Sequence, residues 1–168
     1  MKREKEISFL ELIRLLNRYE IRYLIIGRRA VILYGGPVLT ADHDIWVHPK
    51  DKRKILFLLS ETLNFELSNS PDTKRPMVTG FSGTKRYDFF FQRSVKNIQN
   101  ETIEFESCYD NSVIKEDVRK RVSFRIPSID DLIRLKKIRK ANVKDQQDIE
   151  YLLEAKHLSR KSNNSKSR

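Results

Sequence analysis

Two aspartates one residue apart, Asp42 and Asp44, are the residues of this chain best suited to chemistry. On an extended strand, residues at i and i+2 point to the same face and lie about 6–7 Å apart. Two carboxylates held that close repel each other unless a cation lies between them, and oxygen-only ligands favour Mg²⁺ or Mn²⁺ over zinc. The pair is therefore a candidate metal site. The alternative is a solvated polar turn that precedes a strand.

A third acid, Asp88, stands inside an apolar run, between Tyr87 and three consecutive phenylalanines. A carboxylate buried in such a run is costly unless a partner compensates its charge. A metal shared with Asp42 and Asp44 would compensate it, and so would an ion pair with Arg86. In the remaining alternative, Asp88 lies at the edge of a strand and faces solvent.

Gly27 is a candidate phosphate-binding residue. It ends an apolar strand and leads into a helix that begins near Arg28 or Arg29. A glycine at such a turn lets the backbone approach a phosphate, and the free amides of a helix start carry a partial positive charge. We therefore expect this turn to lie beside the acidic pair.

Lys136 is the second candidate for phosphate binding. It shares one face of a predicted helix with three apolar residues, so its ammonium leans toward the core side or the edge of a cleft. Asp145, near the start of the last predicted helix, could orient it. The alternatives are a lysine whose stem snorkels along the surface and an aspartate that only favours the helix macrodipole.

Hydrophobic periodicity places these residues on alternating helices and strands, which predicts an α/β (α+β) fold with a mixed central sheet flanked by helices and a helical C-terminal part. A capping box formed by Ser8 and Glu11 opens the first helix. We expect one domain, residues 1–155, followed by a basic disordered tail, residues 156–168. The predicted helices cover residues 9–19, 30–34, 51–63, 128–140 and 143–155, and the predicted strands cover 22–26, 44–47, 65–67, 77–81, 85–91, 103–107 and 122–126.

Charge is the unusual feature of the composition. The 168 residues hold 34 Lys plus Arg against 23 Asp plus Glu, a formal net charge of +11, and removing the five positive charges of the tail leaves +6. That excess suits a polyanion such as RNA, although ordinary solubility charge explains it equally well. The single cysteine, Cys108, excludes an intramolecular disulfide and a cysteine zinc site. No stretch has the length of a signal peptide or membrane span, so we expect a cytoplasmic protein.

Taken together, these pieces resemble the nucleotidyltransferase-like superfamily of the DNA polymerase beta type. The nearest match is the small stand-alone bacterial group that includes the AbiEii-type toxins. The family pattern is a strand that ends in glycine, a short helix, a Thr or Ser, Asp-x-Asp and a later lone Asp, and it spans about residues 20–155. The chain supplies Ile25-Ile26-Gly27, Ala30-Val31, Tyr34-Gly35, Pro37, Thr40, Asp42-His43-Asp44-Ile45, Asp88, Ile126 to Lys136, and Lys144-Asp145-Gln146-Gln147-Asp148.

The resemblance implies transfer of a nucleoside monophosphate from a nucleoside triphosphate to a hydroxyl acceptor, with Mg²⁺ or Mn²⁺. It implies that the catalytic and metal-binding residues are Asp42, Asp44 and Asp88. The residues that it implies for nucleotide binding are Gly27, Arg28, Arg29, Thr40 and Lys136. The implied acceptor is RNA, a protein hydroxyl as in toxin–antitoxin pairs, or a small molecule, although the chain is short for an antibiotic-modifying enzyme.

Two positions depart from the family pattern. Arg28 stands where the family has a second small residue, and Val38 stands where it often has an arginine after the proline. Arg28 keeps the backbone amide and adds a cation, so it either strengthens phosphate binding or blocks the pocket. The alternative function is therefore a catalytically inactive relative that binds RNA or a protein partner through its basic surface.

Overall fold

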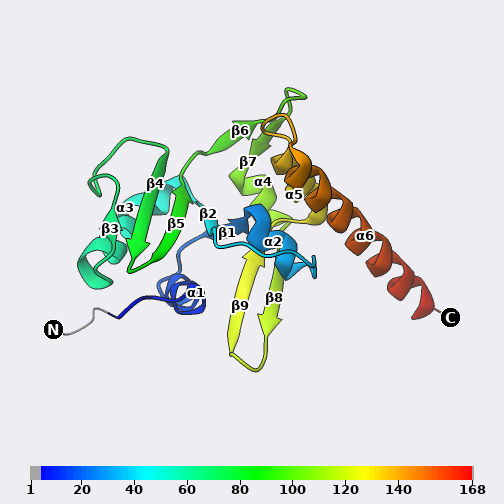
Figure 1. Cartoon of the computed structure of the whole chain (residues 1–168), viewed down its shortest axis with the longest axis horizontal. Helices are drawn as coiled ribbons and strands as arrows, with labels where there is room; N and C mark the ends of the chain where they lie inside the picture. The colour runs from blue at the N-terminus through cyan, green and yellow to red at the C-terminus, as the bar shows by residue number, and fades with distance from the viewer. Residues whose placement is uncertain (1–4, 168) are drawn as a thin grey trace.

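A five-stranded mixed sheet forms the centre of the computed structural model, which describes residues 5–167. The strand order is β1-β2-β5-β4-β3; β2 and β5 run parallel, and the other neighbouring strands run antiparallel (Figure 1). This arrangement confirms the predicted mixed sheet. The strands are β1 (Tyr23–Ile26), β2 (Asp44–Val47), β3 (Glu66–Leu67), β4 (Met77–Ser82) and β5 (Lys85–Phe90).

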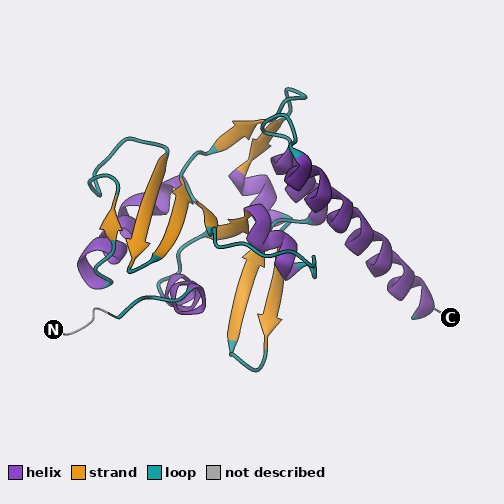
Figure 2. Cartoon of the chain, in the orientation of Figure 1, coloured by secondary structure: helices purple, strands orange, loops and turns teal. Residues whose placement is uncertain are grey.

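Helices flank this sheet, and two separate hairpins extend from it (Figure 2). The helices are α1 (Phe9–Arg18), α2 (Gly27–Leu33), α3 (Lys52–Phe57), α4 (Phe105–Asp110), α5 (Ile129–Lys136) and α6 (Val143–Ser165), with a 3₁₀ turn η1 (Pro49–Asp51) and a π-helical turn η2 (Leu58–Thr62). The hairpins are β6 (Ser94–Lys96) with β7 (Thr102–Glu104), and β8 (Val113–Asp117) with β9 (Val122–Ile126). No helix within residues 5–167 is long and apolar enough to cross a bilayer.

The alternation of side chains along β2 and β5 separates a core face of the sheet from a second face. Ile45 and Phe89 are fully buried in the main hydrophobic core. Trp46 belongs to a second, smaller apolar cluster with Phe105 of α4. Because successive strand residues point to opposite faces, Asp44 lies on the same side of the sheet as Trp46. The second face of the sheet therefore carries both Asp44 and Trp46.

Helix α1 begins as the sequence predicts. The Ser8 hydroxyl accepts a hydrogen bond from the Glu11 amide, and the Glu11 carboxylate accepts one from the Ser8 amide. Leu12, Ile13 and Leu16 then bury one face of the helix in the main core. The predicted capping box is confirmed, and it fixes the helix that covers the core side of the sheet.

Three segments differ from the sequence-based expectations. Residues 105–107, the end of the strand predicted at 103–107, belong to α4, because Phe105 and Cys108 bury one helical face. Helix α5 stops at Lys136, since Asn142 and Asp145 cap a new helix six residues later. Helix α6 continues to Ser165, so most of the predicted disordered tail is helical. No Gly or Pro interrupts it, and extending a helix is easier than nucleating one. Residues 1–4 of the predicted domain and Arg168 of the predicted tail lie outside the described residues.

Candidate active site

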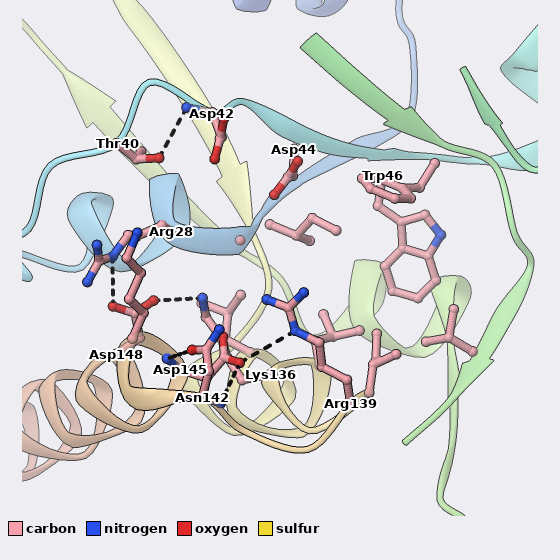
Figure 3. A pocket seen from close by; sticks show the side chains of 18 of the residues that line it. Arg28, Thr40, Asp42, Asp44, Trp46, Lys136, Arg139, Asn142, Asp145 and Asp148 are labelled. Atoms are coloured by element: carbon pink, nitrogen blue, oxygen red, sulfur yellow. Dashed lines mark hydrogen bonds and ion pairs between the residues drawn. The ribbon is translucent and has the colours of Figure 1, made fainter. Parts of the chain in front are cut away.

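A cavity of about 620 Å³ lies on the second face of the sheet, between the ends of β1 and β2 and the helices α2, α5 and α6. Its acidic and basic side chains face each other (Figure 3): Asp42 and Asp44 lie on one side, and Arg28 and Lys136 lie on the other. The predicted site residues that line it are Gly27, Arg28, Thr40, Asp42, Asp44 and Lys136. Asp88 and Arg29 are not among its lining residues.

Asp44 is the first residue of β2 and carries the most perturbed carboxyl of the cavity. Burial, followed by the neighbouring charges of Asp88 and Asp42, raises its pKa to about 6. No hydrogen bond reaches its side chain from any of the described residues. A carboxylate in this position gains free energy from a cation that neutralises it.

Asp88 is the register partner of Asp44 across the parallel β2–β5 pair, so the structure brings these two acids to the same face. Its carboxylate accepts a hydrogen bond from the Thr79 hydroxyl at 2.6 Å and one from Arg86 Nε at 3.2 Å. The predicted ion pair with Arg86 and the predicted proximity to the acidic pair therefore occur together. Thr79 was not identified from the sequence, because only the β4–β5 register places it opposite Asp88.

Gly27 is the residue against which Asp44 packs. Its φ of +66° lies in the left-handed region, and a Cβ added there would meet Asp44 Oδ2 at 2.5 Å. A side chain would therefore displace the carboxylate and strain the backbone. Gly27 was predicted to let the backbone approach a phosphate. In the structure, its missing side chain makes room for the Asp44 carboxylate.

The donor set of the acidic side fits a hard cation. Within residues 5–167, no three His, Cys, Asp or Glu side chains are clustered as a complete metal site. Asp44 nonetheless carries an uncompensated carboxylate beside Asp88 and Asp42. Mg²⁺ is commonly held by one or two carboxylates together with water and substrate phosphates, so these residues are suitable partial ligands.

The basic side is organised by Asp148 of α6. Its carboxylate accepts a hydrogen bond from Arg28 Nε at 3.1 Å and one from Lys136 Nζ at 2.8 Å. Only 2% of the Asp148 side chain is exposed, against 11% for Lys136 and 20% for Arg28. One buried acid therefore holds the two cations at the cavity wall, and Gln147 accepts a further bond from Arg28 at 3.2 Å.

Asp145, which the sequence suggested as the acid that orients Lys136, makes other contacts. It completes the capping box of α6 with Asn142, and it pairs with Arg139 at 3.6 Å. Asp148 orients Lys136 instead. The sequence spacing could have indicated that Asp148 is buried, because Asp145, Asp148 and Leu152 share one helical face and Leu152 is fully buried.

Arg29 and Thr40 support the loop before the acidic pair. The Arg29 guanidinium lies 5.2 Å from the centre of the Phe9 ring and donates a hydrogen bond to the Thr40 carbonyl at 3.2 Å. The Thr40 hydroxyl accepts a hydrogen bond from the Asp42 amide at 3.1 Å. Arg29 thus faces away from the cavity, and Thr40 shapes the backbone that presents Asp42.

His43 lies between the two acids but points to the opposite face. Its ring stacks between Phe9 and Tyr87, with centroid distances of 4.7 and 4.9 Å. Burial, followed by the charge of Arg29, lowers its pKa to about 4. The neutral imidazole is therefore a core residue.

The far end of the cavity is apolar. Figure 3 shows Trp46 and Arg28 at opposite ends of it, with Asp44 between them. The Trp46 indole donates a hydrogen bond to the Gln92 carbonyl at 2.7 Å, which fixes the ring. We call the residues of this end the apolar wall: Trp46, Phe90, Val95, Leu135 and Ile138.

No protein-family profile and no curated protein sequence matches this chain. Its fold is similar to a lincomycin-bound crystal structure of the lincosamide antibiotic adenylyltransferase LnuA, with a TM-score of 0.62, 14% identity, and coverage of 88% of this chain and 98% of that chain. It is also similar to the antibiotic-resistance factor ANT(2'')-Ia, with a TM-score of 0.58, 12% identity, and coverage of 93% and 89%. An antigenic nucleotidyltransferase-like protein from Paracoccidioides brasiliensis matches with a TM-score of 0.56, 16% identity, and coverage of 88% and 72%.

These likenesses establish that the chain has the nucleotidyltransferase fold, as its sequence motifs indicated. They also correct one argument from length. The sequence predicts a chain that is short for an antibiotic-modifying enzyme, yet the match spans 98% of the LnuA chain. A small-molecule acceptor is therefore compatible with a chain of this size, and the AbiEii-type subgroup stays a prediction.

Proposed function

We propose that the protein transfers a nucleoside monophosphate from a nucleoside triphosphate to a hydroxyl acceptor. The observation that carries this proposal is the placement of Asp44 and Asp88 as neighbours on one face of the sheet, with the pKa of Asp44 raised to about 6, opposite Arg28 and Lys136. Negative charge faces positive charge across a cavity, as a reaction of a metal-bound triphosphate requires.

In the proposed reaction, the acceptor oxygen attacks the α-phosphorus and a new phosphorus–oxygen bond forms. The bond between the α-phosphorus and its bridging oxygen breaks, and pyrophosphate leaves with that oxygen. Asp88 takes the hydroxyl proton, and Asp42 and Asp44 would hold the divalent cation. Mg²⁺ would supply the Lewis acidity that stabilises the entering and leaving oxygens.

Arg28 and Lys136 bind the β- and γ-phosphates in this proposal. Asp148 holds both cations at the cavity wall before the nucleotide arrives, so less conformational freedom is lost on binding. Arg28, the departure from the family pattern, then strengthens phosphate binding. Lys136 belongs to the segment from Ile126 to Lys136 that matches the family pattern.

The experiment is incubation of the protein with Mg²⁺, each α-³²P-labelled nucleoside triphosphate in turn, and one of three acceptor pools: total RNA, cell-lysate protein, or a set of small hydroxyl compounds. We expect label in one pool and its loss in Asp44→Asn. Label in RNA or protein would identify the acceptor class and, for protein, would fit a toxin–antitoxin role. Absence of both label transfer and Mg²⁺-dependent nucleotide binding would refute the proposal.

A second candidate function is binding of RNA without chemistry. The observation that favours it is the engagement of Arg28 with Asp148 and Gln147, which leaves less of its hydrogen-bonding capacity for a phosphate. RNA binding that weakens with salt and persists in Asp42→Ala would support this function. Loss of binding in Asp42→Ala would contradict it, since that substitution removes a negative charge.

A further inference from the structure

The apolar wall of the cavity has no role in holding a triphosphate or a cation. Trp46 and Phe90 follow Asp44 and Asp88 by two residues on β2 and β5, so they continue the same face of the sheet beyond the acids. Val95 of β6 and Leu135 of α5 pack against the same apolar cluster. The phosphate-binding cations lie at the other end of the cavity (Figure 3).

From this arrangement we propose that the apolar wall is the acceptor site, and that the acceptor is a small, uncharged molecule with an apolar alkyl or ring surface beside its hydroxyl. This inference rests on the proposed nucleotidyl transfer and specifies its substrate class. Phe90 of the apolar wall follows Asp88, the residue assigned to the acceptor proton, by two residues on β5, and the cavity residue Gln92 follows the end of that strand.

Exposure supports an apolar ligand. Ile138 of the apolar wall lines the cavity with 45% of its surface exposed. Large apolar side chains left open to water at a concave site gain free energy when a ligand covers them. A cavity of about 620 Å³ is large enough for a drug-sized molecule.

Charge argues against a polycationic acceptor. The acids Asp145 and Asp148 already pair with cations, and Asp42 and Asp44 serve the metal. Four basic lining residues, Arg28, Lys136, Arg139 and Lys144, balance these four acids, so the cavity has no excess of negative charge to attract a polycation. At the apolar end, Gln92 offers an uncharged hydrogen-bonding side chain, which suits a neutral polar group such as a sugar hydroxyl.

The test measures binding of hexyl β-D-glucoside, a neutral probe with an alkyl chain, by calorimetry and by fluorescence. Trp46 is the only tryptophan of the chain, so its emission reports on the apolar wall alone. We expect saturable binding with a change in Trp46 emission. We expect at least about tenfold weaker binding of 6-aminohexyl β-D-glucoside, which adds only an ammonium, and of methyl β-D-glucoside, which lacks the chain.

Ile138→Asp should weaken probe binding by at least about tenfold, since it replaces an apolar contact by a charge. Leu158→Asp on α6 is the matched control, because Leu158 is 59% exposed and does not line the cavity. Equal binding by wild type and Ile138→Asp, or no binding by either, would overturn the proposal. Stronger binding of the aminohexyl probe would overturn it as well.

A second titration separates acceptor from nucleoside. With Mg²⁺ and α,β-methylene-ATP, whose α–β bridge cannot be cleaved, the probe should still bind, giving a ternary complex. Competition between the two would assign the apolar wall to the nucleoside and overturn the proposal. If the nucleotide analogue binds and the probe does not, the acceptor inference fails while the transferase proposal stands. If neither this analogue nor the α,β-methylene analogues of the other nucleoside triphosphates bind, the transferase proposal fails first.

Discussion

Two carboxylates of the same cavity, Asp44 and Asp148, differ in whether a cation pairs with them. Asp148, with 2% of its side chain exposed, accepts hydrogen bonds from two cations. Asp44 receives no hydrogen bond from the described residues, and burial beside two other acids raises its pKa to about 6. The difference shows that the chain can neutralise a buried acid and does so where the acid is structural. Asp44 has no such partner among the described residues, and this difference is the basis of the cation binding proposed there.

The largest expected effect comes from removing the uncompensated acid. Asp44→Asn should lower nucleotidyl transfer by at least about 1000-fold, because a metal ion supplies several kcal/mol of transition-state stabilisation through this ligand. Single-turnover transfer of labelled nucleotide is the measurement. Asp72→Asn, an exposed aspartate of a distant loop, serves as the control. A fall of less than tenfold in Asp44→Asn would mean that the carboxylate holds no catalytic cation.

Removing the compensated acid should instead damage stability. Asp148→Asn leaves two largely buried cations without their partner, which costs about 3–5 kcal/mol of unfolding free energy. Lys136→Met should cost less, because Asp148 keeps Arg28 as a partner. Urea denaturation of each variant measures the difference.

A control for the Asp148 prediction is Asp130→Asn. Asp130 pairs with Lys156 but is 67% exposed, so its loss should cost about 1 kcal/mol or less. If Asp148→Asn lowered the unfolding free energy as little as Asp130→Asn, the ion pairs of Asp148 with Arg28 and Lys136 would not organise the basic side of the cavity.

Gly27→Ala tests whether Asp44 determines the residue opposite it. In the wild type the substitution should cost the strain of a positive φ, about 1–2 kcal/mol, plus displacement of the carboxylate that lies 2.5 Å from the added Cβ. In an Asp44→Ala background only the backbone strain should remain. A thermal-denaturation double-mutant cycle gives the coupling. An identical cost in both backgrounds would show that backbone conformation alone requires the glycine.

The smallest net effect concerns pH, where Asp44 and His43 act in opposite directions. The folded pKa of Asp44, about 6, exceeds its reference value of 3.8, so the native state holds the proton more tightly. Its contribution to stability is therefore lost as pH rises from about 4 to 6. The folded pKa of His43, about 4, lies below its reference value of 6.5, so its contribution is lost as pH falls from 6.5 to 4.

Each group accounts for at most about 3 kcal/mol, and the two nearly cancel in the wild type. In the presence of a chelator, Asp44→Asn should make stability rise with pH between 4.5 and 6.5. His43→Phe should make stability fall over the same range. Urea denaturation at several pH values checks both slopes, and unchanged slopes in either variant would contradict the corresponding shift.

The sequence predicted the sheet better than the helices around the site. The strand predicted at 44–47 coincides with β2. In the segment 103–107, predicted as a strand, apolar and polar residues alternate, and only the i, i+3 spacing of Phe105 and Cys108 indicates α4. Short apolar runs fit either period, so tertiary packing decides between them.

The site was predictable where its residues belong to a motif and not where they are brought in by tertiary contacts. Asp42, Asp44 and Gly27 stand in a local pattern, and all line the cavity. Thr79 and Asp148 meet Asp88 and Lys136 only through strand register and helix packing. Arg29 is adjacent to Arg28 in sequence, yet the helix turns it toward Phe9.

The parallel pairing of β2 with β5 has a kinetic consequence. Each strand also belongs to a local antiparallel pair, β1–β2 and β4–β5, and only the parallel contact joins the two. Forming that contact closes a long loop. Because loop closure lowers the chain entropy, we expect the parallel contact to form late in folding. Asp44 and Asp88 become neighbours only at that step. Refolding chains should therefore acquire secondary structure before they acquire affinity for a divalent ion.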